Sequence, residues 1–364
     1  MFNFQGGLFF KDKTLRKPLN TDNVMAELDQ KSPIKEHGLG AQNSIVHFNS
    51  TFIEFIDRSR FFYGMATLTF VHGLIFISGT LLYFTFEVLL KSSITYKEIP
   101  YYLFIYIAFL PLLIWVISLL KKVVFTFSYF PVRFNRKNQK VYYMDSKKMV
   151  HVFDWHELEV KLYHYAQDVC EVRFFKLDDN NNVVQSFVLP HSATRFELDE
   201  VYAHWEFVRA YMEEGAEEPY ANILDYYPYF YKKETIKEAF YRTLVMFRNP
   251  DKENNEHDFD AMRIYMKFFP IFLLHVLGRL IANLTNRLPR FDPDVEAECA
   301  VPADDPYDIY RNHKPRMKVQ RFTMGEKLVL ALNSILGIFI SVFFLHIIFL
   351  LKGDSLLDRL IALF

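Results

Sequence analysis

The apolar residues of the chain gather into three long runs that predict transmembrane helices. Crossing the hydrocarbon core of a bilayer takes about 20 mostly apolar residues in helical conformation. Runs of this kind cover residues 61–86, 101–120 and 328–351. The polar segment 91–100, KSSITYKEIP, connects the first two runs, so we expect them to form a helical hairpin.

A fourth apolar run, 268–277, is too short to cross a bilayer and contains Pro270. With its flanks it predicts an amphipathic helix over 262–285 that lies at the inner membrane surface. A buried helix packed on the cytoplasmic body is the alternative. In the first interpretation, the basic residues at the membrane surface are Arg263, Lys267 and Arg279.

Between the second and third runs the pattern changes to short alternating segments. β-Branched and aromatic residues dominate them, and polar turns separate them at close spacing, which is typical of an antiparallel sheet or a small barrel. The expected strands are 132–135, 141–144, 149–153, 158–162, 172–177 and 183–189.

Helical spacing follows these strands. Val201, Trp205, Val208 and Met212 recur at helical steps, and Gly215 is the expected C-terminal stop. A run of strands closed by one amphipathic helix resembles a pleckstrin-homology-like (PH-like) domain. The predicted fold class is therefore an α+β membrane protein, with three transmembrane helices and a cytoplasmic antiparallel β domain closed by a C-terminal helix.

This pattern divides the chain into consecutive parts. Each is bounded by a change in composition or in the spacing of apolar residues. The expected parts are a cytoplasmic N-terminal segment 1–60, the helical hairpin, the PH-like domain 131–215, a helical cytoplasmic region 216–327, the third span and a C-terminal tail 352–364 on the opposite side.

The positions of lysine and arginine next to the spans predict the orientation. Two precede the first span, six follow the second and six precede the third, which makes 14 on one side, whereas four lie on the other. Because cytoplasmic flanks carry the excess of positive residues, we expect the N-terminus and the large domain in the cytoplasm. The C-terminus of this multi-pass membrane protein is then on the opposite side of the membrane.

Composition supports a mixture of membrane spans and a water-exposed body. Of the 364 residues, 51% are hydrophobic and 18% aromatic, yet 23% are charged, too many for a chain wholly in lipid. A formal net charge of −1 gives no indication of a nucleic-acid partner. Cys170 and Cys299 lie far apart on the expected reducing side, so we expect two buried thiols. The N-terminal sequence lacks the apolar core of a signal peptide.

Motifs of catalysis are not found. The chain contains no G-x-S-x-G, H-E-x-x-H, C-x-x-C or phosphate-binding glycine loop. The segment 178–182 has oxygen ligands but lacks the glycine and glutamate of a calcium loop, so it predicts a hairpin turn. We expect no enzyme activity, no cofactor and no metal. The best metal candidates on the predicted strands are His151, Asp154, His156, Glu157 and His164, but His151 and His156 should point to opposite faces of an unbroken strand.

Polar and small residues inside the spans are candidates for contacts with a partner. Buried polar groups in lipid bond across helices, and small residues allow close helix approach. Transport or proton conduction is the alternative, but it requires a ladder of such groups. The candidate intramembrane contacts are His72, Gly73, Ser78, Gly79, Asn333 and His346.

A basic segment follows the second span. Clusters of this kind bind anionic headgroups, although positive residues at this place also fix topology without any further role. The candidate membrane-surface contacts are Lys121, Lys122, Arg133, Arg136, Lys137 and Lys140.

Five stretches have a familiar combination of residues: RKPL at 16–19, PVRFNRKNQKVY at 131–142, DWHEL at 154–158, WEFVRAYMEEG at 205–215 and NRLPRFDPDVEAEC at 286–299. Together they resemble a bacterial inner-membrane family whose members occur near type VI secretion and antibacterial-toxin genes. The resemblance implies a multi-pass immunity protein of the bacterial inner membrane, with a periplasmic C-terminal tail, that neutralises a cognate membrane-targeting toxin by protein–protein interaction. A membrane-anchored lipid-binding or scaffold module is the alternative, and self-association into a homo-oligomer stays open.

Overall fold

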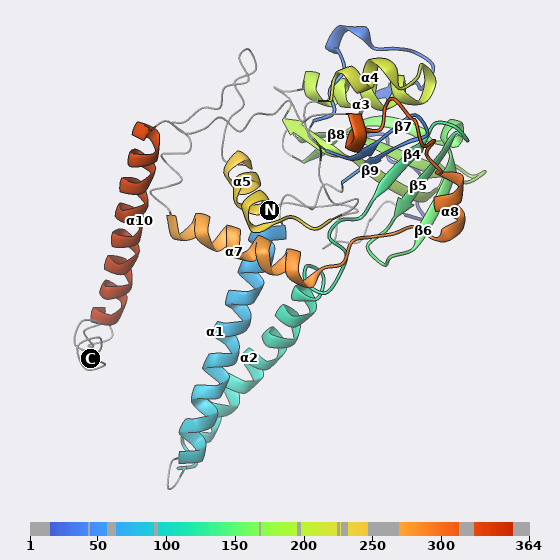
Figure 1. Ribbon diagram of the computed structural model, residues 1–364. Coiled ribbons are helices and arrows are strands. Elements are labelled where there is room, and N and C mark those ends of the chain that lie inside the picture. The colour runs from blue at the N-terminus through green and yellow to red at the C-terminus, as the bar shows by residue number, and fades with distance from the viewer. Residues whose placement is uncertain are drawn as a thin grey trace.

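The computed structural model describes residues 15–42, 44–56, 63–90, 94–166, 169–194, 198–223, 226, 232–246, 269–312 and 324–351. In these residues two antiparallel sheets and a closing helix form a β body, and a long helical hairpin projects from it (Figure 1). The α+β class predicted from the sequence is confirmed.

The first sheet has four strands in the order β1-β7-β8-β9. They are β1 (Val24–Leu28), β7 (Glu159–Ala166), β8 (Val169–Leu177) and β9 (Val183–Thr194). All neighbours pair antiparallel. The turn between β8 and β9 is the predicted hairpin, in which the Asp178 amide donates to the carbonyl of Asn182.

The second sheet has five strands in sequence order, β2-β3-β4-β5-β6. They are β2 (Ile45–Phe48), β3 (Phe52–Phe55), β4 (Val132–Asn135), β5 (Lys140–Met144) and β6 (Val150–Asp154). Every strand expected between 132 and 189 is therefore present. The sequence did not predict β1, β2 and β3, so the β body extends beyond 131–215 and includes part of the N-terminal segment.

The helical hairpin is an insertion between two paired strands. It consists of α1 (Tyr63–Leu90) and α2 (Ile99–Leu120), which lie between β3 and β4 in the chain. Because Phe55 at the end of β3 pairs with Val132 at the start of β4, the chain leaves the sheet and returns to the neighbouring strand. Strands β2 and β3 precede the hairpin in the chain, and β4, β5 and β6 of the same sheet follow it.

Aromatic side chains from both sheets and from α3 (Leu198–Glu213) fill the main core. The rings of Trp155 and Trp205 stack with centroids 5.9 Å apart, and those of Phe174 and Phe187 stack at 4.7 Å. Gly215 ends α3 as predicted: its φ of 131° is disfavoured for other residues, and its amide donates to the carbonyl of Ala210.

Shorter helices follow α3, and one long helix ends the described chain. They are α4 (Glu217–Ala221), α5 (Ile236–Met246), α7 (Phe269–Thr285), α8 (Pro293–Glu298), α9 (Ile309–Asn312) and α10 (Met324–Leu351), with short 3-10 turns at Lys35–His37 and Trp155–Glu157. The amphipathic helix expected over 262–285 is helical from Phe269 onward, and its first part lies outside the described residues.

His204 of α3 is a buried histidine that stays neutral. Its Nδ1 lies 3.2 Å from the carbonyl oxygen of Gly40, and its ring packs edge-on against Phe55. Burial, with a smaller contribution from His191, lowers the pKa of His204 from 6.5 to about 3. Charging this side chain inside the body is therefore costly.

We expect His204 to make the β body lose stability as the pH falls below 6.5. Between pH 6.5 and about pH 3 the histidine of the unfolded chain binds a proton that the buried one does not. The stability that neutral His204 contributes is therefore complete above this pH range and is lost within it. At about pH 4.5 the loss is on the order of 2 kcal/mol. Denaturant unfolding of the full chain in detergent micelles, at neutral and acidic pH, measures it.

The matched variant is His204→Gln, whose amide can still donate to Gly40 but does not titrate in this range. Its free energy of unfolding should depend less steeply on pH than that of the wild type, because the other titrating groups are the same. Equal slopes for the two proteins would show that His204 does not titrate as described.

Candidate functional site

The outer surface of the α1–α2 hairpin is strongly apolar. The segments Ala66–Leu90 and Ile99–Leu120 are long and apolar enough to cross a membrane. Most of their large side chains point away from the protein; the exposed set includes Ile75, Phe76, Leu82, Phe86, Phe104, Ile107, Ile114 and Trp115. Soluble proteins rarely expose a continuous apolar surface of this size, which fits contact with lipid or with another apolar surface.

Inside the hairpin the two helices hold together by apolar packing and two hydrogen bonds. Ile77 and Leu81 of α1 are buried against Val116 of α2. Near the far end, the hydroxyls of Thr85 and Tyr106 lie 2.7 Å apart, and the hydroxyl of Tyr102 donates to Glu87 at 3.1 Å. The polar groups at this end are thus partly used within the hairpin.

The predicted intramembrane contact residues do not form one group. Gly73 faces Val116 inside the hairpin, whereas nothing lies within 4 Å of a Cβ atom built on Gly79. His72 is exposed and its Nδ1 lies 3.0 Å from the carbonyl of Leu68, and Ser78 donates to the carbonyl of Leu74 at 2.6 Å. These two bonds therefore satisfy polar groups within α1 itself.

Two further candidates lie on α10, which covers the third predicted span as one helix. Asn333 is half-buried, and the side chain of His346 lies outside the described residues. Within the described part of α10 the apolar segment Lys327–Phe339 is shorter than a full crossing. Among the described residues, two helices, α1 and α2, are therefore long and apolar enough for a membrane span.

Helix α7 lies across the first turn of α1 (Figure 1), and the two backbones touch. A Cβ atom on Gly278 would collide with the carbonyl oxygen of Gly64. In the same way, a Cβ atom on Gly64 would lie 3.0 Å from the ring of His275. Glycines at both positions are what allow this close crossing.

The polar face of α7 points into the protein. Arg279 is 4% exposed and its Nη2 lies 2.7 Å from Oε1 of the fully buried Glu234. Asn283 donates to the backbone carbonyl of Glu234 at 3.0 Å. The expectation that Arg279 contacts the membrane surface was wrong, because a buried carboxylate binds it; Arg263 and Lys267 lie outside the described residues.

The segment after α7 holds the chain where it returns from the hairpin. The side chain of Asn286 accepts a hydrogen bond from the amide of Thr126 and donates to the carbonyl of Val123. Arg287 and residues 126–128 form a short parallel bridge, with two backbone hydrogen bonds of 2.8 Å. The helices and the β body are therefore joined by fixed polar contacts at this point.

A buried ion pair joins the two strands between which the hairpin is inserted. Arg133 and Glu54 are each 2% exposed, stand opposite each other on β4 and β3, and approach to 2.7 Å. The Tyr129 hydroxyl donates to the same carboxylate, and Glu296 of α8 binds the other side of the guanidinium. Burial disfavours the charge of Arg133, but Glu54 and Glu296 outweigh it and raise the pKa of the guanidinium.

Arg133 is therefore not a membrane-surface residue, contrary to the prediction. The cations of the β4–β5 turn also make contacts within the body: Arg136 donates to the carbonyl of Ser50 at 2.9 Å, and Lys140 pairs with Glu298 at 3.0 Å. Lys137 is exposed in the same turn, and Lys121 and Lys122 lie directly after the last residue of α2. The six basic residues do not form one surface.

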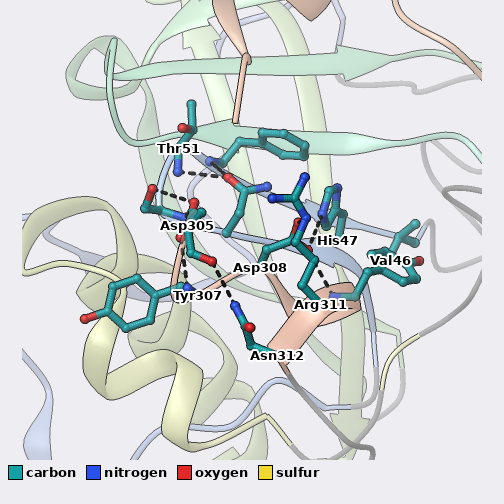
Figure 2. Close-up of polar contacts among 12 residues, drawn as sticks. Val46, His47, Thr51, Asp305, Tyr307, Asp308, Arg311 and Asn312 are labelled. Carbon is teal, nitrogen blue, oxygen red and sulfur yellow. Dashed lines mark hydrogen bonds and ion pairs between the residues drawn. The ribbon is translucent and has the colours of Figure 1, made fainter. Parts of the chain in front are cut away.

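The chain that leads toward α10 is attached to the β2–β3 turn by acidic side chains (Figure 2). Asp305 accepts hydrogen bonds from the amide and the hydroxyl of Ser50, at 2.8 and 2.6 Å. Nε2 of His47 lies 3.4 Å from the buried carboxylate of Asp308. Burial raises the pKa of this carboxyl, but the hydrogen bond and charge of His47 lower it below its ordinary value.

Within the described ranges, no three histidine, cysteine or acidic side chains stand close enough to hold a metal ion. The predicted best candidates have other neighbours: His151 lies 3.2 Å from Asp145, His156 lies 3.8 Å from Glu213, and Glu157 pairs with Lys176. Cys170 and Cys299 are both buried thiols, as predicted.

The comparisons with known proteins place the chain in a family. A family of unknown function, DUF6708, matches residues 109–302, which is more than half of the chain. The chain belongs to this family. No curated protein and no solved structure gave a significant match. The DUF6708 match includes the second half of α2, the strands β4 to β9, α3, α7 and α8, so Arg133 and Gly278 both lie within it.

Replacing Gly278 of the DUF6708 region with alanine should separate α7 from α1. The added methyl group meets a backbone oxygen, which cannot move aside as a flexible side chain would. We expect a loss of about 1–3 kcal/mol, typical of overpacking, in thermal unfolding of the detergent-solubilised chain. The control, Gly79→Ala, has open space around it and should be neutral or slightly stabilising. Equal effects at the two sites would contradict the close crossing.

Replacing Arg133 with methionine should destabilise the β body strongly. The change leaves Glu54 buried without its cation, which costs about 3–5 kcal/mol in comparable cases. Lys137→Met, the same type of change at an exposed position two residues beyond β4, should alter the unfolding free energy by no more than about 0.5 kcal/mol. Denaturant unfolding monitored by tryptophan fluorescence compares the two, and a mild effect of Arg133→Met would show that Glu54 is not held by this cation.

Proposed function

We propose that this protein is an inner-membrane immunity protein, which neutralises a cognate membrane-targeting toxin by direct contact and without chemistry. The observation that carries the proposal is the exposed apolar surface of the α1–α2 hairpin, which is built into the middle of a sheet and so held at a fixed position. The sequence resemblance to immunity-type inner-membrane proteins supports the same role.

The proposed topology has three crossings. Helix α10 supplies the third, with the N-terminus and the β body in the cytoplasm and the C-terminus in the periplasm. The distribution of lysine and arginine beside the apolar runs supports this orientation. We also interpret the two-sheet body closed by α3 as a PH-like domain, because strands followed by one closing helix have the order of elements that such a domain uses.

Inhibition in this proposal takes place inside the membrane. A toxin that assembles helices in the bilayer presents apolar surfaces, which van der Waals packing against another helix pair can occupy. The hairpin offers such a pair, with large side chains such as Ile107, Ile114 and Trp115 on the outside of α2. The β body then holds the hairpin at a constant depth, and no catalytic residue is needed.

The alternative, a lipid-binding or scaffold module, is supported less well. It depends on a basic surface after the second span, but Arg133, Arg136 and Lys140 make contacts within the body. Salt-sensitive binding of the full chain to anionic lipid through these residues is the outcome that would favour it.

The decisive experiment is a contact-dependent competition assay. A strain that lacks the gene is mixed with its parent, and we expect it to be killed, because the parent delivers the toxin and the recipient has no inhibitor. Restoring the full chain should restore survival. If the deletion strain survives contact with the parent as well as the complemented strain does, the immunity proposal is wrong.

A set of variants tests where the contact lies. The combined change Ile107→Leu, Ile114→Leu and Trp115→Leu keeps the outside of α2 apolar but alters its shape. We expect this variant to stay in the membrane fraction and to lose protection. Leu89→Ile with Leu90→Ile, exposed at the far end of α1, is the control and should protect normally. Full protection by the first variant would show that the outside of α2 does not contact the toxin.

A further inference from the structure

Three large apolar side chains are exposed where the hairpin meets the β body. Leu277 and Leu284 lie on α7 and are 43% and 79% exposed, and Phe125, which follows α2, is 77% exposed. The two leucines are seven residues apart and therefore lie on one face of the helix. We call these three residues the apolar belt.

Helix α7 departs from the polarity of a helix on the surface of a soluble protein. Such a helix buries an apolar stripe and exposes its polar residues. In the described part of α7, His275, Arg279 and Asn283 are buried beside Val276 and Ala282, while Leu277 and Leu284 face outward. The crossing at Gly278 and the ion pair of Arg279 with Glu234 prevent the helix from turning its leucines inward.

Phe125 is held outward by a strained backbone. Its φ is 58°, in the left-handed region that bulky residues rarely adopt. Asn286 binds the backbone on both sides of it, at Val123 and Thr126, and so fixes this conformation. Because Asn286 comes two residues after Leu284, Phe125 and Leu284 flank the same set of hydrogen bonds.

The surroundings of the belt point to the bilayer as its occupant. Helix α7 crosses α1 at Gly64, just before the apolar segment Ala66–Leu90 begins. Leu277 is next to this crossing in the chain, so the belt lies at the level where the apolar surface of the hairpin starts. Exposed cations lie close to the belt residues in the sequence and match anionic headgroups; they are Lys121, Arg287 and Arg290.

We propose that the apolar belt is seated in the inner leaflet, at the boundary between headgroups and acyl chains. Helix α7 then lies in the plane of the membrane and fixes the height of the β body above it, as amphipathic helices do when their apolar face enters this boundary. The lipid-contacting side chains are the leucines and the phenylalanine, not the basic residues of α7. This inference rests on the membrane location in the proposed function, and the test separates the two.

The test measures the depth of single labels on the full chain. Cys170 and Cys299 are replaced with alanine, and one cysteine at a time is introduced at Leu277, Leu284, Ile107 or Val184. Each carries an environment-sensitive fluorophore. The protein is reconstituted into vesicles of phosphatidylethanolamine and phosphatidylglycerol. Quenching by a lipid with a nitroxide near the headgroup end of its chain is compared with quenching by aqueous iodide.

We expect the labels at Leu277 and Leu284 to be quenched by the nitroxide lipid and protected from iodide. The label at Val184, an exposed apolar position on β9, should show the reverse. Two belt positions are used so that a folding defect in one variant does not decide the result. Quenching of both belt labels by iodide, to the extent seen at Val184, overturns the proposal. Protection from both quenchers also overturns it, because protein then covers the belt.

The label at Ile107, in the middle of α2, distinguishes this failure from failure of the membrane anchor. If it is quenched by lipid carrying a nitroxide deep in the chain while the belt labels respond to iodide, the anchor holds and only the belt is wrong. If Ile107 is reached by iodide as well, the hairpin does not lie in the bilayer, and the proposed function fails with it.

Discussion

The buried ion pair between Glu54 and Arg133 joins the two strands on which the whole arrangement depends. These residues stand opposite each other on β3 and β4, although the entire helical hairpin separates them in the chain. An ion pair this deeply buried contributes little net stability, but losing one partner is costly. The pair therefore makes correct pairing of β3 with β4 a condition for folding. It also fixes where the hairpin leaves the β body and where it returns.

The C-terminal half of the described chain reinforces this junction from outside. Asn286 and Arg287 hold the returning segment, Glu296 binds the far side of Arg133, and Asp305 and Asp308 attach the chain to the β2–β3 turn and to β2. Each contact joins residues far apart in sequence. As a result, a movement of the hairpin cannot occur without disturbing polar contacts of the body.

The sequence determined the local elements because these follow from spacing. Period-two alternation predicted the strands from 132 to 189, helical steps predicted α3, and long apolar runs predicted α1, α2 and α10. The strands β1, β2 and β3 were missed, although they are as long as β4, β5 and β6, which the alternation predicted. Strand β1 pairs with β7 and β3 pairs with β4, partners that lie far along the chain, and β2 pairs with β3. These strands therefore depend on tertiary pairing more than on local pattern.

Only the tertiary structure decided which way the charged side chains point. Arg133 and Arg279 look like surface cations in the sequence, because composition shows their charge but not their partners. Glu54 and Glu234 form ion pairs with these arginines inside the protein. Both are distant from their partners in the chain and belong to segments with no distinctive pattern. The sequence by itself therefore determined the apolar helices, most of the strands and the absence of known catalytic motifs. The direction of each charge, and hence the outward leucines of α7, depended on contacts that form only when the chain folds back on itself.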